Sequence, residues 1–144
     1  MTWSATELAY AAGLIDGEGT ITIRPRKNPL GTTYHYIGIS LSNTEPAMVE
    51  WLCCFGGSVG LQRPEKANHK ALYRWTIDGL AGEGFLRAVE PYLVTKRAQA
   101  RLALAVRATI RPRGSRLTPE LRAERLALLG QMRVLNQRGL EFVA

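Results

Sequence analysis

The sequence predicts an α+β fold in which helices cover one face of an antiparallel sheet. Two observations favour this fold class. Several segments place apolar residues at helical spacing, whereas others alternate apolar and polar residues, as strands do. The alternating segments each have one apolar and one polar face, which is typical of a sheet covered on one side only. The expected order of elements is α-β-β-α-β-β-α-α.

The first helix is expected over residues 5–17, in a stretch rich in Ala and Leu. Ser4 and Glu7 have the spacing of a capping box at its start. Gly17 and Gly19 mark its end, because glycine is the residue that most often stops a helix.

Two strands separated by a loop follow this helix. Residues 20–26 alternate Ile21 and Ile23 with threonines and arginines, and Pro25 indicates an edge strand or the end of a strand. Residues 34–42 alternate branched apolar residues with Tyr, Gly and Ser. The polar sides of these strands are expected to form the uncovered face of the sheet.

The middle of the chain supplies a short helix and two further strands. Pro46 is placed to open a helix that Gly56 and Gly57 end. A weaker strand is expected over 59–63 and a more regular one over 72–78, with a polar and basic loop between them.

Most of the remaining chain is predicted to be helical. Residues 79–84 are expected to form a turn, followed by a short helix over 85–93 and a longer one over 96–110. After a loop at 111–114, a last helix with an apolar stripe begins at Thr118.

Length and composition are those of one folded domain. The chain has 144 residues, of which 46% are hydrophobic and 22% charged. We expect a single domain over 1–144, with a core at about 4–110 and a C-terminal helical extension at about 115–144. No apolar stretch approaches ~20 residues and the N-terminus lacks a signal-peptide pattern. An intracellular location is therefore expected, in the cytoplasm of a prokaryote or an organelle that encodes the protein, with no membrane partner.

The chain is strongly basic, with a net charge of +7 and a pI near 9.9. The excess of basic residues is concentrated in two segments that contain no acidic residue, one between Gly19 and Thr44 and one between Pro91 and Pro119. A solvated face usually mixes both signs of charge. Such a field favours polyanions, above all nucleic acid, with an acidic membrane surface as the alternative.

Neither the cysteines nor the histidines have the spacing of a metal site. Cys53 and Cys54 are adjacent in an apolar run and are expected to be small, reduced core residues. His35 and His69 have no metal-ligating neighbours and are expected at the surface or in contact with nucleic acid.

The end of the first helix carries two carboxylates where a stable helix disfavours them. Asp16 and Glu18 lie at the negative end of the helix dipole, at a cost of roughly 0.3–1 kcal/mol each. Placing acids between glycines at a helix tip presents oxygen ligands to a cation. This pattern predicts a metal site, with an ordinary small-residue helix end as the alternative.

The run Ala-Ala-Gly-Leu-Ile-Asp-Gly-Glu-Gly at 11–19 resembles the signature of the LAGLIDADG homing endonucleases. Ala11 stands in place of the leading Leu, and Gly17 and Glu18 in place of the Ala-Asp before the last Gly. The expected order of helices and strands is also that of the family's core, an antiparallel, saddle-shaped sheet with helices on one face. The resemblance therefore covers most of the chain.

The first helix is also expected to pair with a second helix. Ala9, Gly13 and Gly17 lie four residues apart, a spacing that allows close helix approach; packing on the sheet is the alternative. Only one motif is present, and family members with one motif act as homodimers. The resemblance thus implies a two-fold dimer interface at this helix, formed by Ala9, Ala12, Gly13, Asp16 and Gly17.

The resemblance also implies the roles of individual site residues. Glu18 would be the catalytic metal ligand, assisted by the Gly17 carbonyl, with Mg²⁺ as the cofactor and Mn²⁺ or Ca²⁺ as substitutes. Asp16 would instead be structural, bonding backbone near the helix end. Asn43 would position water near the metals and Lys96 would stabilise charge on phosphate. The alternatives are a turn residue for Asn43 and a helix-start surface charge for Lys96.

Strand alternation turns Asn43 toward the core, so a bulge or the end of the strand is needed for this role. The open polar face and its loops are expected to bind double-stranded DNA in the major groove, with lysines on phosphates. These residues are Arg24, Arg26, Lys27, Tyr34, Tyr36, Ser40, Arg63, Lys66, Lys70, Arg74 and Thr76.

The sequence thus predicts a homodimeric, metal-dependent, site-specific DNA endonuclease of the homing type. By resemblance, it would cut a long, nearly palindromic target and leave short 3′ overhangs. The alternative is a non-cleaving nucleic-acid-binding protein on the same scaffold, such as an intron-splicing maturase or a DNA-binding regulator.

Overall fold

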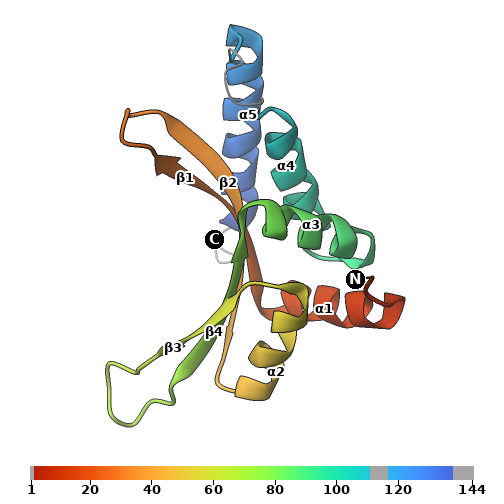
Figure 1. Ribbon diagram of the computed structural model, residues 1–144, viewed down its shortest axis with the longest axis vertical. Helices are drawn as coiled ribbons and strands as arrows, with labels where there is room; N and C mark the ends of the chain where they lie inside the picture. The colour runs from red at the N-terminus through yellow and green to blue at the C-terminus, as the bar shows by residue number, and fades with distance from the viewer. Residues whose placement is uncertain (1, 111–116, 138–144) are drawn as a thin grey trace, which may run out of the picture.

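A four-stranded antiparallel sheet with helices on one face forms the fold (Figure 1). The computed structural model describes residues 2–110 and 117–137. The strand order is β1-β2-β4-β3. The strands are β1 (Gly19–Lys27), β2 (Thr33–Asn43), β3 (Ser58–Gln62) and β4 (Leu72–Asp78). The predicted fold class is confirmed.

The helices all pack on the side of the sheet that faces right in Figure 1. They are α1 (Ala5–Glu18), α2 (Pro46–Trp51), α3 (Gly79–Val89), α4 (Arg97–Ala108) and α5 (Pro119–Asn136), with 3-10 turns η1 (Leu52–Phe55) and η2 (Glu90–Tyr92). Both ends of the sheet lean away from the helices, so the other side is concave. We call this helix-free side the open face. None of the helices among the described residues is long and apolar enough to cross a membrane.

The core lies between the sheet and the helices, as the alternation of the strands predicts. The apolar residues of β2 and β4 that point toward the helices are at most 1% exposed, except Tyr73 near the start of β4. Trp75 and Phe85 stack edge to face with ring centroids 5.3 Å apart, and Phe55 adds a further ring 5.1 Å from Phe85. These contacts join α3 and η1 to the centre of the sheet.

The predicted turn at 79–84 is wrong, because α3 begins at Gly79 directly after β4. The glycines in this segment serve close packing. A Cβ on Gly82 would lie 3.3 Å from the Ile77 carbonyl oxygen and 3.5 Å from that of Ile37. Gly82 therefore lets the first turn of α3 lie directly on the backbone of β2 and β4.

The prediction that Cys53 and Cys54 are core residues is also wrong, because both thiols are exposed. The two cysteines lie in η1, where residues three apart point the same way. Leu52 and Phe55 take the inward positions and are buried, so the residues between them face solvent.

The last helix packs on α4 and on the edge strand β1. Met132 of α5 joins the core cluster. The side chain of Asn136 donates a hydrogen bond to the Ile21 carbonyl oxygen (3.2 Å), and Arg125 donates to the hydroxyl and carbonyl of Thr109 (2.9 Å each). The predicted loop at 111–114 lies outside the described residues.

Gly57 fixes the entry into β3, and its replacement tests the fold. Its φ is +80°, and an added Cβ would lie against the Thr76 carbonyl oxygen and 2.9 Å from Trp75 Nε1. We predict that Gly57→Ala lowers the free energy of unfolding by about 2 kcal/mol or more. Gly60→Ala, on β3 itself and with no atom within 4 Å of its added Cβ, is the control. Urea denaturation measures both, and equal stability of the two variants would contradict the account.

Candidate active site and nucleic-acid interface

The C-terminal tip of α1 presents Glu18 to solvent. The helix continues through Gly17, which the sequence indicated as its end, and stops at Glu18. Gly19 is the C-cap, and its N–H donates to the Ile15 carbonyl. An added Cβ on Gly19 would lie 2.8 Å from Ile15 Cα, so only glycine permits the direct passage from α1 into β1. The Glu18 carboxylate consequently stands at the junction of helix and sheet.

Asn43 meets Glu18 from the end of β2. Its side-chain Nδ2 donates a hydrogen bond to Glu18 Oε2, and its Oδ1 accepts one from the backbone N–H of Glu45 (2.9 Å). The backbone N–H occupies the amide oxygen, which fixes the NH₂ group toward the carboxylate. The ladder with β4 continues through the Asn43–Tyr73 pair, so Asn43 reaches this position at the strand end, without a bulge.

The other acid of the motif, Asp16, is hydrogen-bonded to backbone and a hydroxyl of its own chain. Its carboxylate accepts the backbone N–H groups of Val94 (2.8 Å), Thr95 (3.1 Å) and Lys96 (2.9 Å), and the Thr95 hydroxyl (3.0 Å). Burial by itself raises the pKa of Asp16, but these hydrogen bonds outweigh it and leave the pKa lowered. The structural role inferred for Asp16 is therefore what the structure shows.

Lys96 is anchored at the same helix end. Its Nζ donates a hydrogen bond to the Asp16 carbonyl oxygen (2.6 Å), so its ammonium lies against the last turn of α1. Burial lowers the pKa of Lys96, and the Asp16 carboxylate only partly opposes this shift. A half-buried cation thus binds the backbone of Asp16, two residues before Glu18 in the chain.

The described residues of this chain offer few ligands for a metal ion at the α1 tip. In the part of the chain that the structure describes, no group of three or more His, Cys, Asp or Glu side chains could hold an ion. The carbonyls of the last helical turn, including that of Gly17, lack intrahelical partners. Mg²⁺ takes oxygen ligands and keeps several waters, so one exposed carboxylate and a carbonyl fit it. The ligands at the α1 tip therefore fit Mg²⁺, and a second carboxylate would come from outside this chain.

The outer face of α1 carries small residues with nothing packed on them. Ala9, Gly13 and Gly17 are exposed, and an added Cβ on either glycine would meet no described atom within 4 Å. Packing on the sheet, the alternative considered for this spacing, does not apply to these glycines. Ala12 was expected on the same interface, but it is fully buried in the core. Asp16 is half-buried and turned toward the start of α4.

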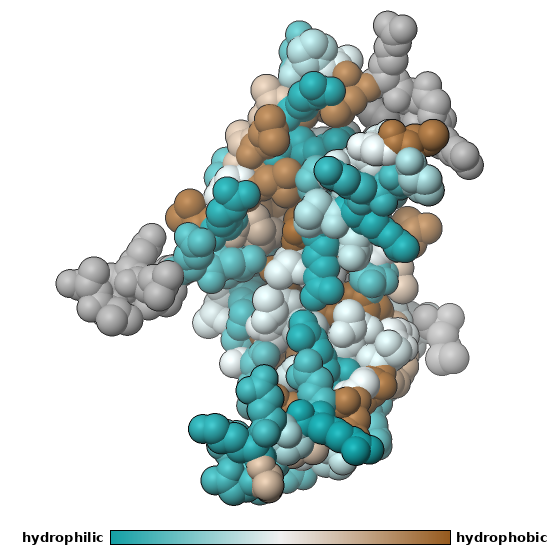
Figure 2. All heavy atoms as spheres, turned by 90° about the vertical axis from the view of Figure 1, so that its left-hand side faces the viewer, coloured by the Kyte–Doolittle hydropathy of each residue, from teal (hydrophilic) through white to brown (hydrophobic). Residues whose placement is uncertain are grey.

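The open face of the sheet gathers most of the predicted nucleic-acid contacts. The strand register places Arg24 opposite Tyr36, Arg26 opposite Tyr34, and Ser40 between Thr20 and Thr76. Figure 2 views this side of the molecule, and hydrophilic residues cover much of its lower half. The predicted residues on this face are Arg24, Arg26, Tyr34, Tyr36, Ser40, Arg74 and Thr76.

Two arginines on this face are held by neighbours that sequence reasoning did not assign to them. Arg24 Nε donates to the Thr22 hydroxyl (3.4 Å), which in turn donates to the Gly38 carbonyl (3.2 Å). An added Cβ on Gly38 would lie 3.1 Å from Arg24 Nε, so this glycine makes room for the arginine. Arg74 Nη2 donates to the Ser40 hydroxyl (3.3 Å), and Ser40 is only 7% exposed. The predicted contact residue Ser40 thus supports Arg74 from beneath.

Two basic residues and one histidine lie elsewhere than expected. Arg63 was predicted on the open face but lies one residue beyond the end of β3, and Leu61, two residues earlier, pairs with the inward-facing Tyr73. Lys27 is the last residue of β1 and not part of a loop, whereas Lys66 and Lys70 lie in the exposed β3–β4 loop as predicted. His35, expected at the surface, is half-buried on the helix side of β2.

Replacing Asp16 tests whether its hydrogen bonds to residues 94–96 stabilise the fold at the candidate site. We predict that Asp16→Ala lowers the free energy of unfolding at pH 7 by about 2 kcal/mol, because three backbone N–H groups lose their acceptor. Asp78→Ala is the control, because Asp78 is an N-cap without a side-chain hydrogen bond.

Since folding lowers the pKa of Asp16, its contribution to stability is complete above the ordinary value of 3.8. It is lost as the pH falls through the lowered folded-state value. The difference between wild type and Asp16→Ala, followed by denaturation between pH 7 and pH 2, should therefore shrink only below about pH 4. A difference that does not depend on pH would contradict this assignment.

Comparisons with known proteins agree with this architecture. No family model and no curated protein sequence matches the chain. Among solved structures, the homing endonuclease I-CvuI in complex with its target in the presence of Ca has 21% identity and a TM-score of 0.70, covering 90% of this chain and 82% of that one. The archaeal intron-encoded homing endonuclease I-Vdi141I complexed with DNA has 14% identity and a TM-score of 0.69, and the match covers 90% of this chain and 84% of that one.

Two further structures differ in how much of their own length is matched. The homing endonuclease I-TnaI has 19% identity and a TM-score of 0.60, and both chains are covered completely. The meganuclease I-SmaMI bound to uncleaveable DNA has 17% identity and a TM-score of 0.65, with 87% of this chain but only 44% of that chain covered. The structural neighbours are LAGLIDADG homing endonucleases, and this chain has their fold.

Proposed function

We propose that the protein is a site-specific DNA endonuclease that acts as a homodimer and uses a divalent metal ion, Mg²⁺, to hydrolyse phosphodiester bonds. The observation that carries this proposal is the exposed Glu18 carboxylate at the tip of α1, at the start of a strand whose open face is basic. A protein that only bound DNA would gain nothing from a negative charge at that place, because it repels phosphate.

The open face supports binding of double-stranded DNA. Arginine, tyrosine and threonine side chains line a concave sheet on a chain with a net charge of +7. A two-stranded ribbon fits the major groove, where arginine reads guanine by two hydrogen bonds. The held positions of Arg24 and Arg74 favour such readout, since a pre-oriented side chain loses less entropy on binding. I-CvuI and I-Vdi141I, which share the fold, are complexed with DNA.

Pairing of two copies through α1 supplies the second carboxylate. The exposed small residues Ala9, Gly13 and Gly17 permit close approach of a second α1 about a two-fold axis. That axis brings together two Glu18 side chains, whose mutual repulsion favours bound cations. The match of this chain to less than half of I-SmaMI agrees with a unit that is used twice.

The residues around Glu18 act on the metal and the phosphate. Mg²⁺ would polarise the scissile phosphate and lower the pKa of a bound water. Asn43 orients the Glu18 carboxylate through its amide NH₂. Lys96 places a positive charge at the end of α1, where it stabilises charge that develops on the phosphate. By resemblance, the target is long and nearly palindromic, and cleavage leaves short 3′ overhangs.

Replacing the carboxylate tests the catalytic role. We predict that Glu18→Gln reduces cleavage of a selected DNA target by about 100-fold or more in Mg²⁺, because the amide is a poor metal ligand. Its DNA affinity should stay equal or rise slightly, since a charge that repels phosphate is removed. Glu45→Gln is the matched control, because Glu45 contacts Asn43 only through its backbone. If wild type cleaves no site from a randomised library but promotes RNA splicing or binds DNA as a regulator, the non-cleaving alternative is correct.

A bulky residue on the outer face of α1 tests the pairing. We predict that Gly13→Arg yields a monomer by sedimentation velocity and abolishes double-strand cleavage, because the two helices no longer approach. Gly84→Arg, at a helical glycine of α3 that is equally open, should leave both properties intact. A Gly13→Arg variant that remains dimeric would place the interface elsewhere.

A further inference from the structure

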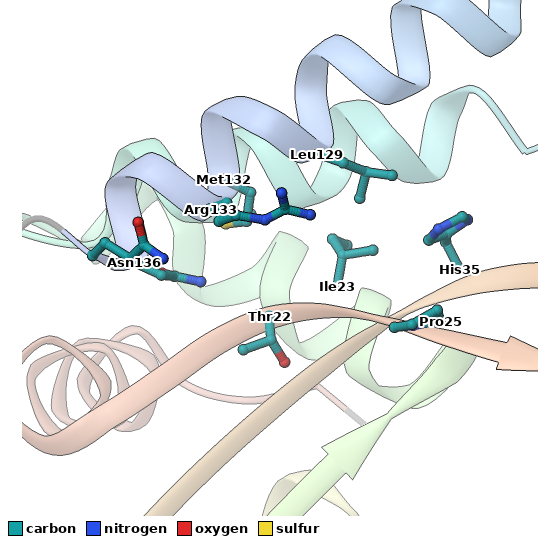
Figure 3. A pocket seen from close by; sticks show the side chains of 9 residues that line it. Thr22, Ile23, Pro25, His35, Leu129, Met132, Arg133 and Asn136 are labelled. Carbon is teal, nitrogen blue, oxygen red and sulfur yellow. The ribbon is translucent and has the colours of Figure 1, made fainter.

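A cavity with polar and apolar walls lies between α5 and the first two strands, on the helix side of the sheet (Figure 3). Its volume is about 320 Å³. Ile23 on β1 and Leu129 and Met132 on α5 form its apolar part, while His35, Arg133 and Asn136 line it with polar groups. Apart from Thr22, its lining residues lie on the helix side of the sheet or on the C-terminal part of the chain, away from the residues proposed to contact DNA.

The charges around the cavity are all positive. Arg133 extends from α5 across the space above Ile23, and it takes part in none of the ion pairs among the described residues. None of the described residues that line the cavity is acidic. Asn136 donates a hydrogen bond from Nδ2 to the Ile21 carbonyl, so its Oδ1 remains as an acceptor for a ligand.

His35, at the other end of the cavity, lacks a hydrogen-bond partner. Its Nδ1 is buried and unpaired among the described residues, although buried polar atoms normally find a partner. Arg125 and Arg133 on α5 and Arg107 on α4 are the charged groups facing it or lining the cavities beside it. Burial and the Arg125 charge lower the pKa of His35, which keeps the ring neutral at pH 7.

We propose that this cavity binds a nucleotide, with its phosphate at Arg133 and its base between the apolar wall and His35. The cationic lining selects an anion, and the apolar wall selects a flat ring attached to it. The volume lies at the lower end of the range of about 300–1,000 Å³ that small-molecule sites occupy. Histidine rings and arginine planes stack on bases, and amide side chains bond base edges. The nucleotide is either free or an unpaired residue of a strand; this inference does not depend on cleavage.

The test follows the His35 ring by NMR while the full-length protein is titrated with AMP, inorganic phosphate and adenosine. AMP is expected to shift the ring signals and to bind about tenfold or more tightly than phosphate or adenosine, because only AMP uses both walls. Its phosphate should also raise the pKa of His35 by offsetting the nearby arginine charge. A short single-stranded oligonucleotide that binds more tightly than AMP would identify a strand as the source.

A matched pair of variants distinguishes specific AMP binding in the cavity from nonspecific attraction of AMP to a basic protein. Arg133→Gln should weaken AMP binding by about tenfold, whereas Arg122→Gln, which removes the same charge from an exposed position of α5, should have little effect. Equal effects of the two variants, adenosine binding as tightly as AMP, or unshifted His35 signals would overturn the proposal. Displacement of AMP by saturating duplex DNA would also overturn it, since the site would then belong to the DNA interface.

Discussion

The arrangement of the candidate site depends on the hydrogen bonds between the Asp16 carboxylate and the segment that leads into α4. Asp16 stands at the negative end of the α1 dipole, which is unfavourable, but also at the positive end of α4. Its bonds to three consecutive backbone N–H groups tie the two helix ends together. The Lys96 ammonium returns to the Asp16 carbonyl and closes the same junction. Neighbouring Glu18 is thereby held at a fixed point beside β1.

The two acids of the motif therefore have different physical explanations. The fold itself accounts for Asp16, since the backbone N–H groups just before α4 give it hydrogen bonds that offset the dipole of its own helix. Glu18 has fewer partners, because among the described side chains its carboxylate hydrogen-bonds only to the Asn43 amide. Under the proposed function a bound cation would balance the Glu18 charge, and this separates the carboxylate proposed to be functional from the structural one.

Sequence patterns predict the sheet well because each strand of the central pair buries one face only. The alternation of Ile37, Ile39 and Leu41 shows which residues of β2 point toward the helices. The remaining residues, together with Arg24 and Arg74 on the neighbouring strands, form the open face. Local signals fail where tertiary packing decides. The glycine-rich segment before Phe85 is typical of a turn, yet Gly82 serves the close seating of a helix.

The same limitation applies to the candidate site. Helical spacing identifies Ala9 and Gly13 as one stripe, but nothing local shows that Ala12 points into the core. His35 is covered by α5, a helix about a hundred residues later in the chain, and no local pattern around His35 indicates this packing. The Asn43–Glu18 contact was inferable only from the resemblance, because it joins a helix tip to a strand end 25 positions away.

The most direct measurement is a crystal structure of the protein with its selected duplex and Mn²⁺, in which anomalous scattering locates the metal. The account predicts two copies per duplex, joined through α1, with Mn²⁺ between the Glu18 carboxylates and the DNA phosphates. A single copy on the duplex, or manganese bound away from Glu18, would contradict it.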